Sequence, residues 1–423
     1  SKILEKVMHT RLSSFLAKHD ILFENQFGFR FNHNTTSAVS VLYNAIIQQY
    51  EHGNAVLGVF IDLQKAFDTI DHDVLIAKLE RYGVRGIALR WFQSYLQGRV
   101  QYVNYLGVES AQGPVCCGIP QGSILGPLLF NLYINDIEKF SPLSTKILYA
   151  DDTNIFLSGK NMQQLFSTMN SELAKLTDWL LANKLSLNVS KTHYVLFSPG
   201  HRNFDTCPDL LLNGSVLERK SSTMFLGVKL DSKLTWSEHI SYIRIKIAKN
   251  IGVINKVRHL LNHSTLRTLY YAFVYPYLTY CIEIWGSAAK CRLNSLYKLQ
   301  KLCCRYISNS PSRTPTLPLL RSLQILPLDK LYEYCVLRLM HQHHHRKLPS
   351  PVLRLFEPRS IRCRVVTRQA EHLELPSFKT QFALSSLFYI GPKLWNSILR
   401  DINVVCSSFT FKSKIRKYLC DQI

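Results

Sequence analysis

The feature that most constrains this chain is a pair of apolar runs, each of which ends in aspartate. Residues 55–61 are continuously apolar and are followed by Asp62, and residues 147–150 are followed by Asp151 and Asp152. A run without polar alternation is typical of a strand that is buried on both faces. A carboxylate at the end of such a strand is costly unless something compensates its charge. The chain must therefore bring these acids to a cation or to solvent at one edge of a sheet.

The three acids together predict a metal site. Asp62 and Asp151 are 89 residues apart, which is enough chain for the two strands to lie side by side. Neighbouring carboxylates repel one another unless a cation holds them, and clusters of oxygen ligands suit Mg²⁺. Two such ions about 3.5–4 Å apart can drive in-line phosphoryl transfer. Alone, Asp62 could cap a helix and the Asp151-Asp152 pair could form a turn, but together they favour a nucleotidyl-transfer site.

The remaining pattern predicts alternating helices and strands. The spacing of apolar residues predicts helices over 3–18, 37–50, 73–82, 127–137 and 161–182, and strands over 55–61, 100–108, 146–150, 154–157, 192–197 and 225–230. Gly83 is expected to stop the third helix, and Asn213-Gly214 to form a hairpin turn. Residues 151 and 152 fall at the tip of a hairpin. Thr235 and Glu238 are expected to form a capping box that begins a helical region.

The positive charge lies almost entirely in the second half of the chain. Residues 1–200 contain 17 Lys and Arg against 16 Asp and Glu, whereas residues 201–423 contain 34 against 13. Neutralisation of phosphates dominates nucleic-acid affinity, so this half is the expected site for a polyanion. Ile240, Ile243 and Ile247 recur at helical spacing between basic residues. Such helices would place one face in a core and another on a phosphate backbone, although a solvated charged face is the simpler alternative.

Cysteine usage indicates a reducing compartment. The eleven cysteines are irregularly spaced and form no CxxC pair, so neither a disulfide framework nor a zinc knuckle is expected. The histidine tract 341–345 lacks regular ligand pairs, and zinc is not expected there either. No run approaches the roughly 18 apolar residues of a membrane span. We therefore expect an intracellular protein, in the nucleus or cytoplasm. The opening Ser1, with no methionine, reads as part of something longer.

Three motifs, in order and suitably spaced, resemble the palm motifs of reverse transcriptases. They are Phe60–Asp68 (FIDLQKAFD), Gly118–Phe130 (GIPQGSILGPLLF) and Tyr149–Asp152 (YADD). Lesser motifs are Gln26–Arg30 (QFGFR), the loop that ends at Lys191, and Phe225–Val228 (FLGV). The chain resembles the enzymes of non-LTR retrotransposons (LINE-type, jockey-like), and residues 391–397 (GPKLWNS) resemble tails of such elements.

The resemblance implies an α/β fold of the right-hand polymerase type and an RNA-directed DNA polymerase. Its palm has an antiparallel sheet, with partial fingers, a helical thumb and a mainly helical C-terminal module. We expect partial fingers at 1–54, the palm with finger insertions and a primer-grip hairpin at 55–232, the thumb at 233–310, and a basic C-terminal module at 311–423. The implied partners are an RNA template, a DNA primer and dNTPs, with two Mg²⁺ ions, which Mn²⁺ can replace. The oligomeric state is not predicted.

The resemblance also implies a role for each matching residue. The catalytic and metal-binding residues would be Asp62, Asp151 and Asp152. The dNTP-binding residues would be Arg30, Leu63, Phe67, Gln121 and Lys191. The template–primer contacts would be made by Gly122, Tyr149 and Gly227. A guanidinium binds phosphates bidentately, and a glycine allows close backbone approach, which suits these assignments.

Phe67 is the residue that discriminates best between related activities. It lies five positions after Asp62, where the family places a bulky gate against a ribose 2′-hydroxyl. An aromatic ring blocks that space and leaves the hydroxyl unpaired, which is unfavourable in a dry site. The position therefore predicts deoxynucleotide use, and the alternative is an ordinary core phenylalanine.

Two other functions remain open. One is a non-catalytic RNA-binding relic or maturase-like protein, which the three intact acids disfavour because binding alone does not require them. The other is a viral-type RNA polymerase, which is disfavoured by Phe67 and by Ala150, where that group prefers glycine.

Overall fold

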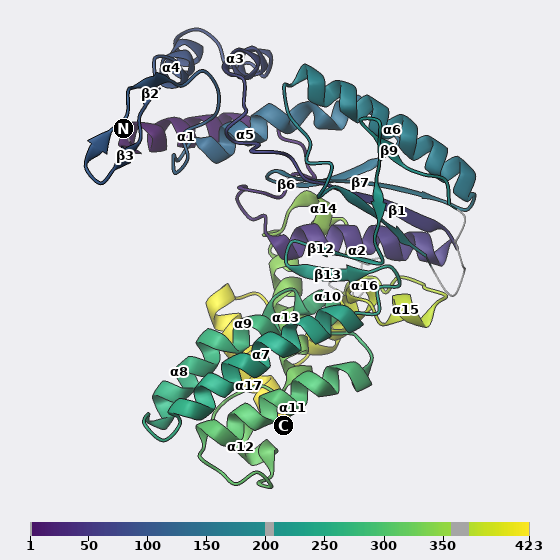
Figure 1. Ribbon diagram of the computed structural model, residues 1–423. Helices are drawn as coiled ribbons and strands as arrows, with labels where there is room; N and C mark the ends of the chain where they lie inside the picture. The colour runs from purple at the N-terminus through teal and green to yellow at the C-terminus, as the bar shows by residue number, and fades with distance from the viewer. Residues whose placement is uncertain (1, 199–206, 357–371, 423) are drawn as a thin grey trace. The chain divides into compact units, whose positions relative to one another are not determined.

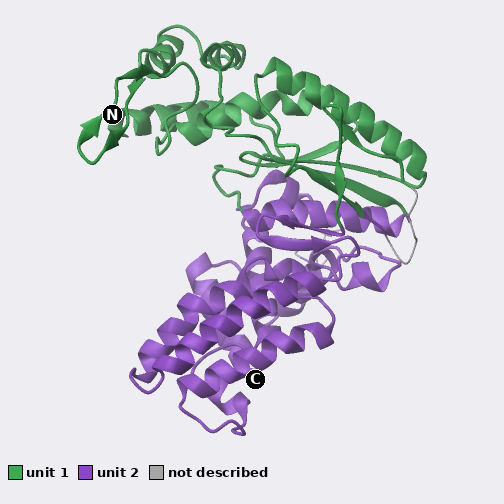
Figure 2. Ribbon diagram, in the orientation of Figure 1, with its two compact units in different colours: residues 1–34, 54–196, 201–220 green, residues 35–53, 197–200, 221–423 purple. Residues whose placement is uncertain are grey.

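The computed structural model describes residues 2–198, 207–356 and 372–422, and these form two compact units (Figure 1, Figure 2). Unit 1 comprises residues 1–34, 54–196 and 201–220, and unit 2 comprises residues 35–53, 197–200 and 221–423. This division differs from the four segments expected from the sequence, which stay predictions.

Unit 1 contains a five-stranded sheet with helices packed on it. Its elements are α1 (Lys2–Lys18), β1 (Ala55–Ile61), α3 (His72–Arg81), α4 (Ile87–Leu96), β2 (Val100–Gln101), β3 (Asn104–Tyr105), β4 (Val108–Glu109), β5 (Gly113–Pro114), α5 (Gly126–Ile134), the 3₁₀ helix η1 (Asn135–Phe140), β6 (Thr145–Tyr149), β7 (Asp152–Gly159), α6 (Met162–Ala182), β8 (His193–Phe197), β9 (Leu211–Leu212), β10 (Ser215–Val216) and β11 (Glu218–Arg219).

The sheet has the strand order β11-β8-β1-β7-β6, which places β1 at its centre. All seven residues of β1 are buried, so the predicted central strand is confirmed. β7 runs antiparallel to both β1 and β6, with Ile61 opposite Thr153 and Tyr149 opposite Asp152. α6 extends along one face of these strands (Figure 1) and buries Leu165 and Phe166. The helix therefore supplies apolar packing for this face of the sheet.

Helix α3 follows its sequence signals closely. The Asp71 side chain accepts a hydrogen bond from the amide of Val74 at 3.0 Å, which satisfies one of the free N–H groups of the first turn. Leu75 and Leu79 form its buried face. Gly83 has φ +98°, a left-handed conformation that ends the helix at low steric cost. The predicted stop at Gly83 is confirmed.

The expected strand over 100–108 is wrong. The segment contains the two-residue strands β2, β3 and β4 instead, and β3 and β4 form a small hairpin. Val103, Tyr105 and Leu106 are 69%, 74% and 86% exposed. Alternation of apolar and polar residues produces a half-buried strand only where another surface covers the apolar face, and here none does within the described residues of unit 1.

Unit 2 combines one hairpin with many helices. Its elements are α2 (Thr35–Glu51), β12 (Ser222–Phe225), β13 (Val228–Asp231), α7 (Ser237–Val257), α8 (His263–Phe273), α9 (Tyr275–Thr279), α10 (Ile282–Trp285), α11 (Lys290–Ile307), α12 (Thr316–Ser322), α13 (Leu328–His344), α14 (Ser350–Leu353), α15 (Gln381–Leu384), α16 (Leu387–Ile398) and α17 (Ser408–Asp421).

The long helices of unit 2 have the predicted two-faced character. α7 buries Ile240, Ile243, Ile247, Ile251 and Ile254 and packs against α11. Its basic side chains stay outside, and the ammonium of Lys246 lies 4.5 Å from the ring centre of Tyr242. No helix in the described part of the chain is both long and apolar enough to cross a bilayer.

Two local expectations in unit 2 are wrong. Residues 225–230 do not form one strand, because Leu226 and Gly227 (φ +47° and +79°) make the turn between β12 and β13. The capping box at α7 does not form either. The carboxylate of Glu238 instead accepts a hydrogen bond from the Ser222 hydroxyl at 2.8 Å and forms a salt bridge with Lys229 at 2.7 Å. The carboxylate of Asp231 accepts hydrogen bonds from the amides of Thr235 and Trp236. Asp231 thus organises the loop before α7, and the helix begins without a side-chain cap.

Candidate active site

The three aspartates lie at one end of the central sheet. Asp62 directly follows β1, and Asp152 begins β7. Because Ile61 is opposite Thr153 in the antiparallel pair, Asp62 and Asp152 are opposite each other one step further along. Asp151 lies in the turn between β6 and β7, next to Asp152. The structure therefore brings together the acids that the sequence places 89 residues apart, as predicted from the strand ends.

The backbone at Asp62 is held by the loop that contains Lys191. The amide of Asp62 donates to the hydroxyl of Thr192 at 3.3 Å, and its carbonyl accepts the amide of Asn188 at 2.8 Å. The backbone of Leu63 pairs with that of Leu187 in an antiparallel bridge. Thr192 was not singled out in the sequence, although it is only 1% exposed. A buried threonine whose hydroxyl meets a distant strand end leaves no local sequence signal.

The electrostatics of the site indicate uncompensated negative charge. Desolvation, followed by repulsion from Asp151 and Asp62, raises the pKa of Asp152 to about 6. The ammonium of Lys191 lies 3.7 Å from a carboxylate oxygen of Asp62, but the Lys191 side chain is 69% exposed and that of Asp62 is 39% exposed. Ion pairs of this kind contribute about 0–1 kcal/mol, so Lys191 balances the acids only weakly.

The donor set fits a hard divalent cation, although the side chains are not arranged as a closed ligand cage. Carboxylate oxygens are the ligands that Mg²⁺ prefers, and it typically binds through one or two carboxylates together with waters and substrate phosphates. No group of three or more His, Cys, Asp or Glu in the described ranges is arranged to hold an ion by itself. Repulsion at Asp152 nevertheless favours a cation beside Asp62, Asp151 and Asp152.

Phe67 packs beside the site in an aromatic cluster of unit 1. Its ring stacks on Phe130 with centroids 4.4 Å apart and meets the edge of Phe29 at 6.2 Å. These contacts fix the ring, as a gate requires, and they equally suit a core residue. Gln121 donates to the carboxylate of Asp68 at 2.9 Å. Gly122 has φ +79° and open space where a side chain would project.

Two further predicted residues have clear structural surroundings. The guanidinium of Arg30 donates to the carbonyls of Phe23 and Gln26, at 2.6 and 3.3 Å, and its burial lowers its pKa. Arg30 therefore braces its own loop, and its phosphate role stays a prediction. Gly227, in unit 2, forms the β12–β13 turn, where a Cβ would lie 3.2 Å from the ring of Tyr280. Tyr280 donates to the carbonyl of Leu226 at 2.6 Å.

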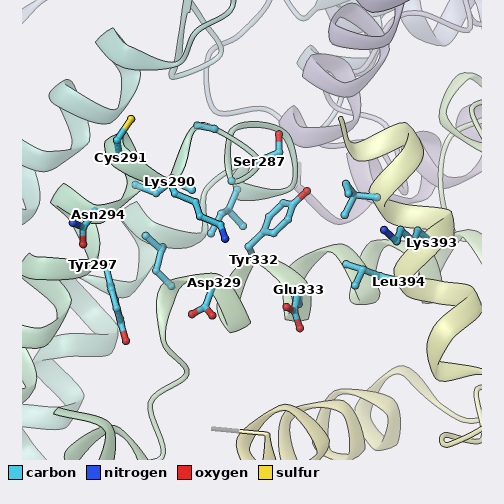
Figure 3. Close-up of a pocket in the computed structure, with 16 residues that line it drawn as sticks. Ser287, Lys290, Cys291, Asn294, Tyr297, Asp329, Tyr332, Glu333, Lys393 and Leu394 are labelled. Atoms are coloured by element: carbon cyan, nitrogen blue, oxygen red, sulfur yellow. The ribbon is translucent and has the colours of Figure 1, made fainter. Parts of the chain in front are cut away.

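A pocket of about 830 Å³ in unit 2 is lined by none of the predicted site residues (Figure 3). Lys290, Cys291 and Asn294 of α11 line one part, and Asp329 and Glu333 of α13 line another. Glu333 is paired with Lys330 at 3.0 Å, so its charge is already matched. Lys290 and Asp329 add charges beside the Cys291 thiol, but none of these residues belongs to the motifs found in the sequence.

Comparison with known proteins agrees with these motifs. Residues 1–230 match the family described as reverse transcriptase (RNA-dependent DNA polymerase). The chain is 30% identical over 342 residues to the RNA-directed DNA polymerase from mobile element jockey of Drosophila melanogaster, covering 78% of this chain and 37% of that protein. It is 30% identical over 380 residues to a probable RNA-directed DNA polymerase from transposon BS of the same organism, covering 84% and 41%. The chain thus spans about two fifths of these relatives.

Among solved structures, apo telomerase from Candida tropicalis is similar with a TM-score of 0.43 and 12% identity, covering 79% of this chain and 57% of that one. The predicted α/β class is confirmed by the elements of unit 1, where helices accompany a five-stranded sheet in which β7 is antiparallel to both neighbours.

Proposed function

Because the chain belongs to the reverse transcriptase family, we propose that it is the RNA-directed DNA polymerase of a non-LTR retrotransposon, adding dNTPs to a primer 3′-hydroxyl. The observation that carries this proposal is the meeting of Asp62, Asp151 and Asp152 at one end of a buried sheet. Each acid occupies its place in a family motif, and their mutual repulsion is what a site for divalent cations requires.

In this proposal the three carboxylates bind two Mg²⁺ ions, or Mn²⁺ in their place. Divalent ions supply activation of the 3′-hydroxyl and stabilisation of the leaving pyrophosphate. Asp62, Asp151 and Asp152 would hold the ions, with Asp152 in the supporting role. The backbone beside Leu63 and the side chain of Lys191 would lie along the triphosphate, with Arg30 contributing a further charge.

The remaining assignments concern the nucleic acid and the sugar. Phe67 would exclude a 2′-hydroxyl, and its stacking on Phe130 supplies the rigidity for this. Gln121 and Gly122 would face the template and nucleotide, while Tyr149 and Gly227 would contact the primer. The basic residues of 201–423 would hold an RNA template and DNA primer through their phosphates. The described cysteines are all free, which agrees with an intracellular location in nucleus or cytoplasm.

The test is extension of a DNA primer on an RNA template. The native chain should extend the primer with dNTPs and Mg²⁺, and Asp151→Asn should abolish extension because it removes a ligand charge. Asp178→Asn is the matched control, since Asp178 is an exposed aspartate on α6 that belongs to none of the motifs. Salt-dependent RNA binding without extension would favour the binding-only alternative. Extension with ribonucleotides would favour an RNA polymerase.

A further inference from the structure

The turn that carries Asp151 and Asp152 is strained. Ala150 has φ +56°, in the left-handed region that side-chain-bearing residues rarely occupy. It is also buried, at 5% exposure, between the last residue of β6 and the exposed acid Asp151. A backbone in this conformation persists only where its surroundings restrain it. What restrains Ala150 therefore decides where the two acids point.

A single buried amide side chain forms hydrogen bonds with both backbone polar groups of Ala150. The Oε1 atom of Gln26 accepts the amide of Ala150 at 3.0 Å and the amide of Gly28 at 2.8 Å. Its Nε2 atom donates to the carbonyl of Ala150 at 3.4 Å. Gln26 is 2% exposed and 124 residues away in sequence. One side chain thus engages both backbone polar groups of the strained residue.

The segment around Gln26 is itself fixed against β6. The amide of Phe27 donates to the carbonyl of Leu148 at 2.8 Å, and the amide of Leu148 donates to the carbonyl of Asn25 at 2.9 Å. Gly28 lies against the turn so closely that a Cβ there would clash with the backbone nitrogen of Ala150. Its carbonyl accepts from the side chain of Asn131 in α5 at 2.8 Å. These contacts make the segment a rigid base for the glutamine.

We propose that Gln26 is a positioning residue for nucleotidyl transfer, because its amide clamps the Ala150 peptide so that Asp151 and Asp152 face Asp62. This inference rests on the proposed function. Gln26 does not touch substrate; it acts through the turn. A structural role alone would predict only a loss of stability when it is replaced. The clamp also predicts weaker metal binding and a slower chemical step, because replacing groups that orient metal ligands typically costs roughly 10–100-fold.

The main variant is Gln26→Met, which keeps the length of the side chain and removes every hydrogen bond to the turn. We expect the Mn²⁺ binding midpoint, measured by calorimetry without nucleic acid, to rise by roughly tenfold. We expect kcat for primer extension to fall by a similar factor and KM for dNTP to change little. Hydrogen exchange of the amides at 150–153 should become faster, and this readout needs neither metal nor activity.

Gln300→Met is the matched control. Gln300 is 0% exposed, and its amide donates to the Tyr270 hydroxyl and the Leu326 carbonyl, at 3.0 and 2.9 Å, within unit 2. Its replacement should lower stability without changing the Mn²⁺ midpoint or exchange at 150–153. Ala150→Gly provides a rescue, because glycine adopts a positive φ without strain. In the Ala150→Gly background, Gln26→Met should lower the Mn²⁺ affinity less than it does in the native chain. If Gln26→Met does not fold in the native chain, its effect is measured in the Ala150→Gly background.

The outcomes separate this inference from the function on which it rests. A native chain that neither extends a primer nor binds Mn²⁺ counts against the proposed function, while exchange at 150–153 still tests the clamp. Equal exchange rates at 150–153 in the native chain and Gln26→Met would overturn the clamp. So would a Gln300→Met variant that shifts the Mn²⁺ midpoint as much as Gln26→Met does.

Discussion

Replacing Glu283 with glutamine should remove a pH-dependent loss of stability from unit 2. Glu283 lies in α10, and its Oε2 atom is buried without a hydrogen-bond partner among the described residues. Burial raises the pKa of this carboxyl from its ordinary 4.5 to about 7, and a hydrogen bond within its own residue and the charge of Arg338 oppose the shift only in part. The negative form of Glu283 is therefore poorly tolerated in the folded chain.

The direction of the effect follows from proton binding. Between pH 4.5 and about 7 the unfolded chain has lost the proton of Glu283 while the folded chain still holds it. The stabilising contribution is fully present below pH 4.5 and is lost as the pH rises through about 7. A difference of roughly 2.5 pKa units corresponds to about 3 kcal/mol of unfolding free energy. Glutamine has the shape of the protonated acid and does not titrate.

The measurement is amide hydrogen exchange in α10 and α13, which reports the unfolding free energy of unit 2 even if the two units unfold separately. From pH 5 to pH 8 the stability of Glu283→Gln relative to the native chain should increase by about 2–3 kcal/mol. Glu333→Gln is the control, because Glu333 is paired with Lys330 at 3.0 Å on the surface of α13. A relative stability of Glu283→Gln that stays constant over this range would refute the burial argument.

Three shorter predictions concern the candidate site and the hairpin of unit 2. Phe67→Val removes the ring that stacks on Phe130 and should raise ribonucleotide incorporation by roughly tenfold or more; the ratio of kcat/KM for dNTP and rNTP measures this, and an unchanged ratio would make Phe67 an ordinary packing residue. Lys191→Met should slow primer extension at saturating dNTP while changing the unfolding free energy by less than about 1 kcal/mol, since the pair with Asp62 is exposed; an unaltered rate would remove Lys191 from the site. Gly227→Ala should destabilise unit 2 by about 1–3 kcal/mol, because of its positive φ and the nearby Tyr280 ring; an unchanged melting temperature would contradict this.

The sequence predicted those parts of the fold whose signals are local and strong. β1 was predictable because a short run of seven consecutive apolar residues suits a fully buried strand, and α3 because of its helical spacing of apolar residues and the stop at Gly83. The segment 100–108 was mispredicted because alternation cannot reveal whether a partner surface exists. The turn at Leu226-Gly227 was missed because a left-handed backbone at leucine has no sequence signature.

The candidate site likewise contains residues that the sequence predicted and contacts that it could not predict. Asp62, Asp151 and Asp152 were predictable because each ends an apolar run, and the register of β1 with β7 then brings them together. The contacts of Gln26 and Thr192 were not, since each pairs with a backbone more than 120 residues away. For Arg30, the motif suggested a phosphate-binding residue, whereas in the structure its guanidinium donates to carbonyl groups of its own loop.

The acids themselves favour an enzyme over a binding-only relic. The raised pKa of Asp152 means that a fully ionised cluster destabilises the folded chain, and the exposed Lys191 offsets little of it. The strained backbone of Ala150 destabilises the folded chain further. It is held by a hydrogen bond to buried Gln26 and by the close approach of Gly28. RNA binding alone gains nothing from such an arrangement, because the phosphate contacts that dominate it need basic residues and not acids. A chain under no demand for catalysis would relieve the repulsion by losing a single carboxylate, and here all three remain.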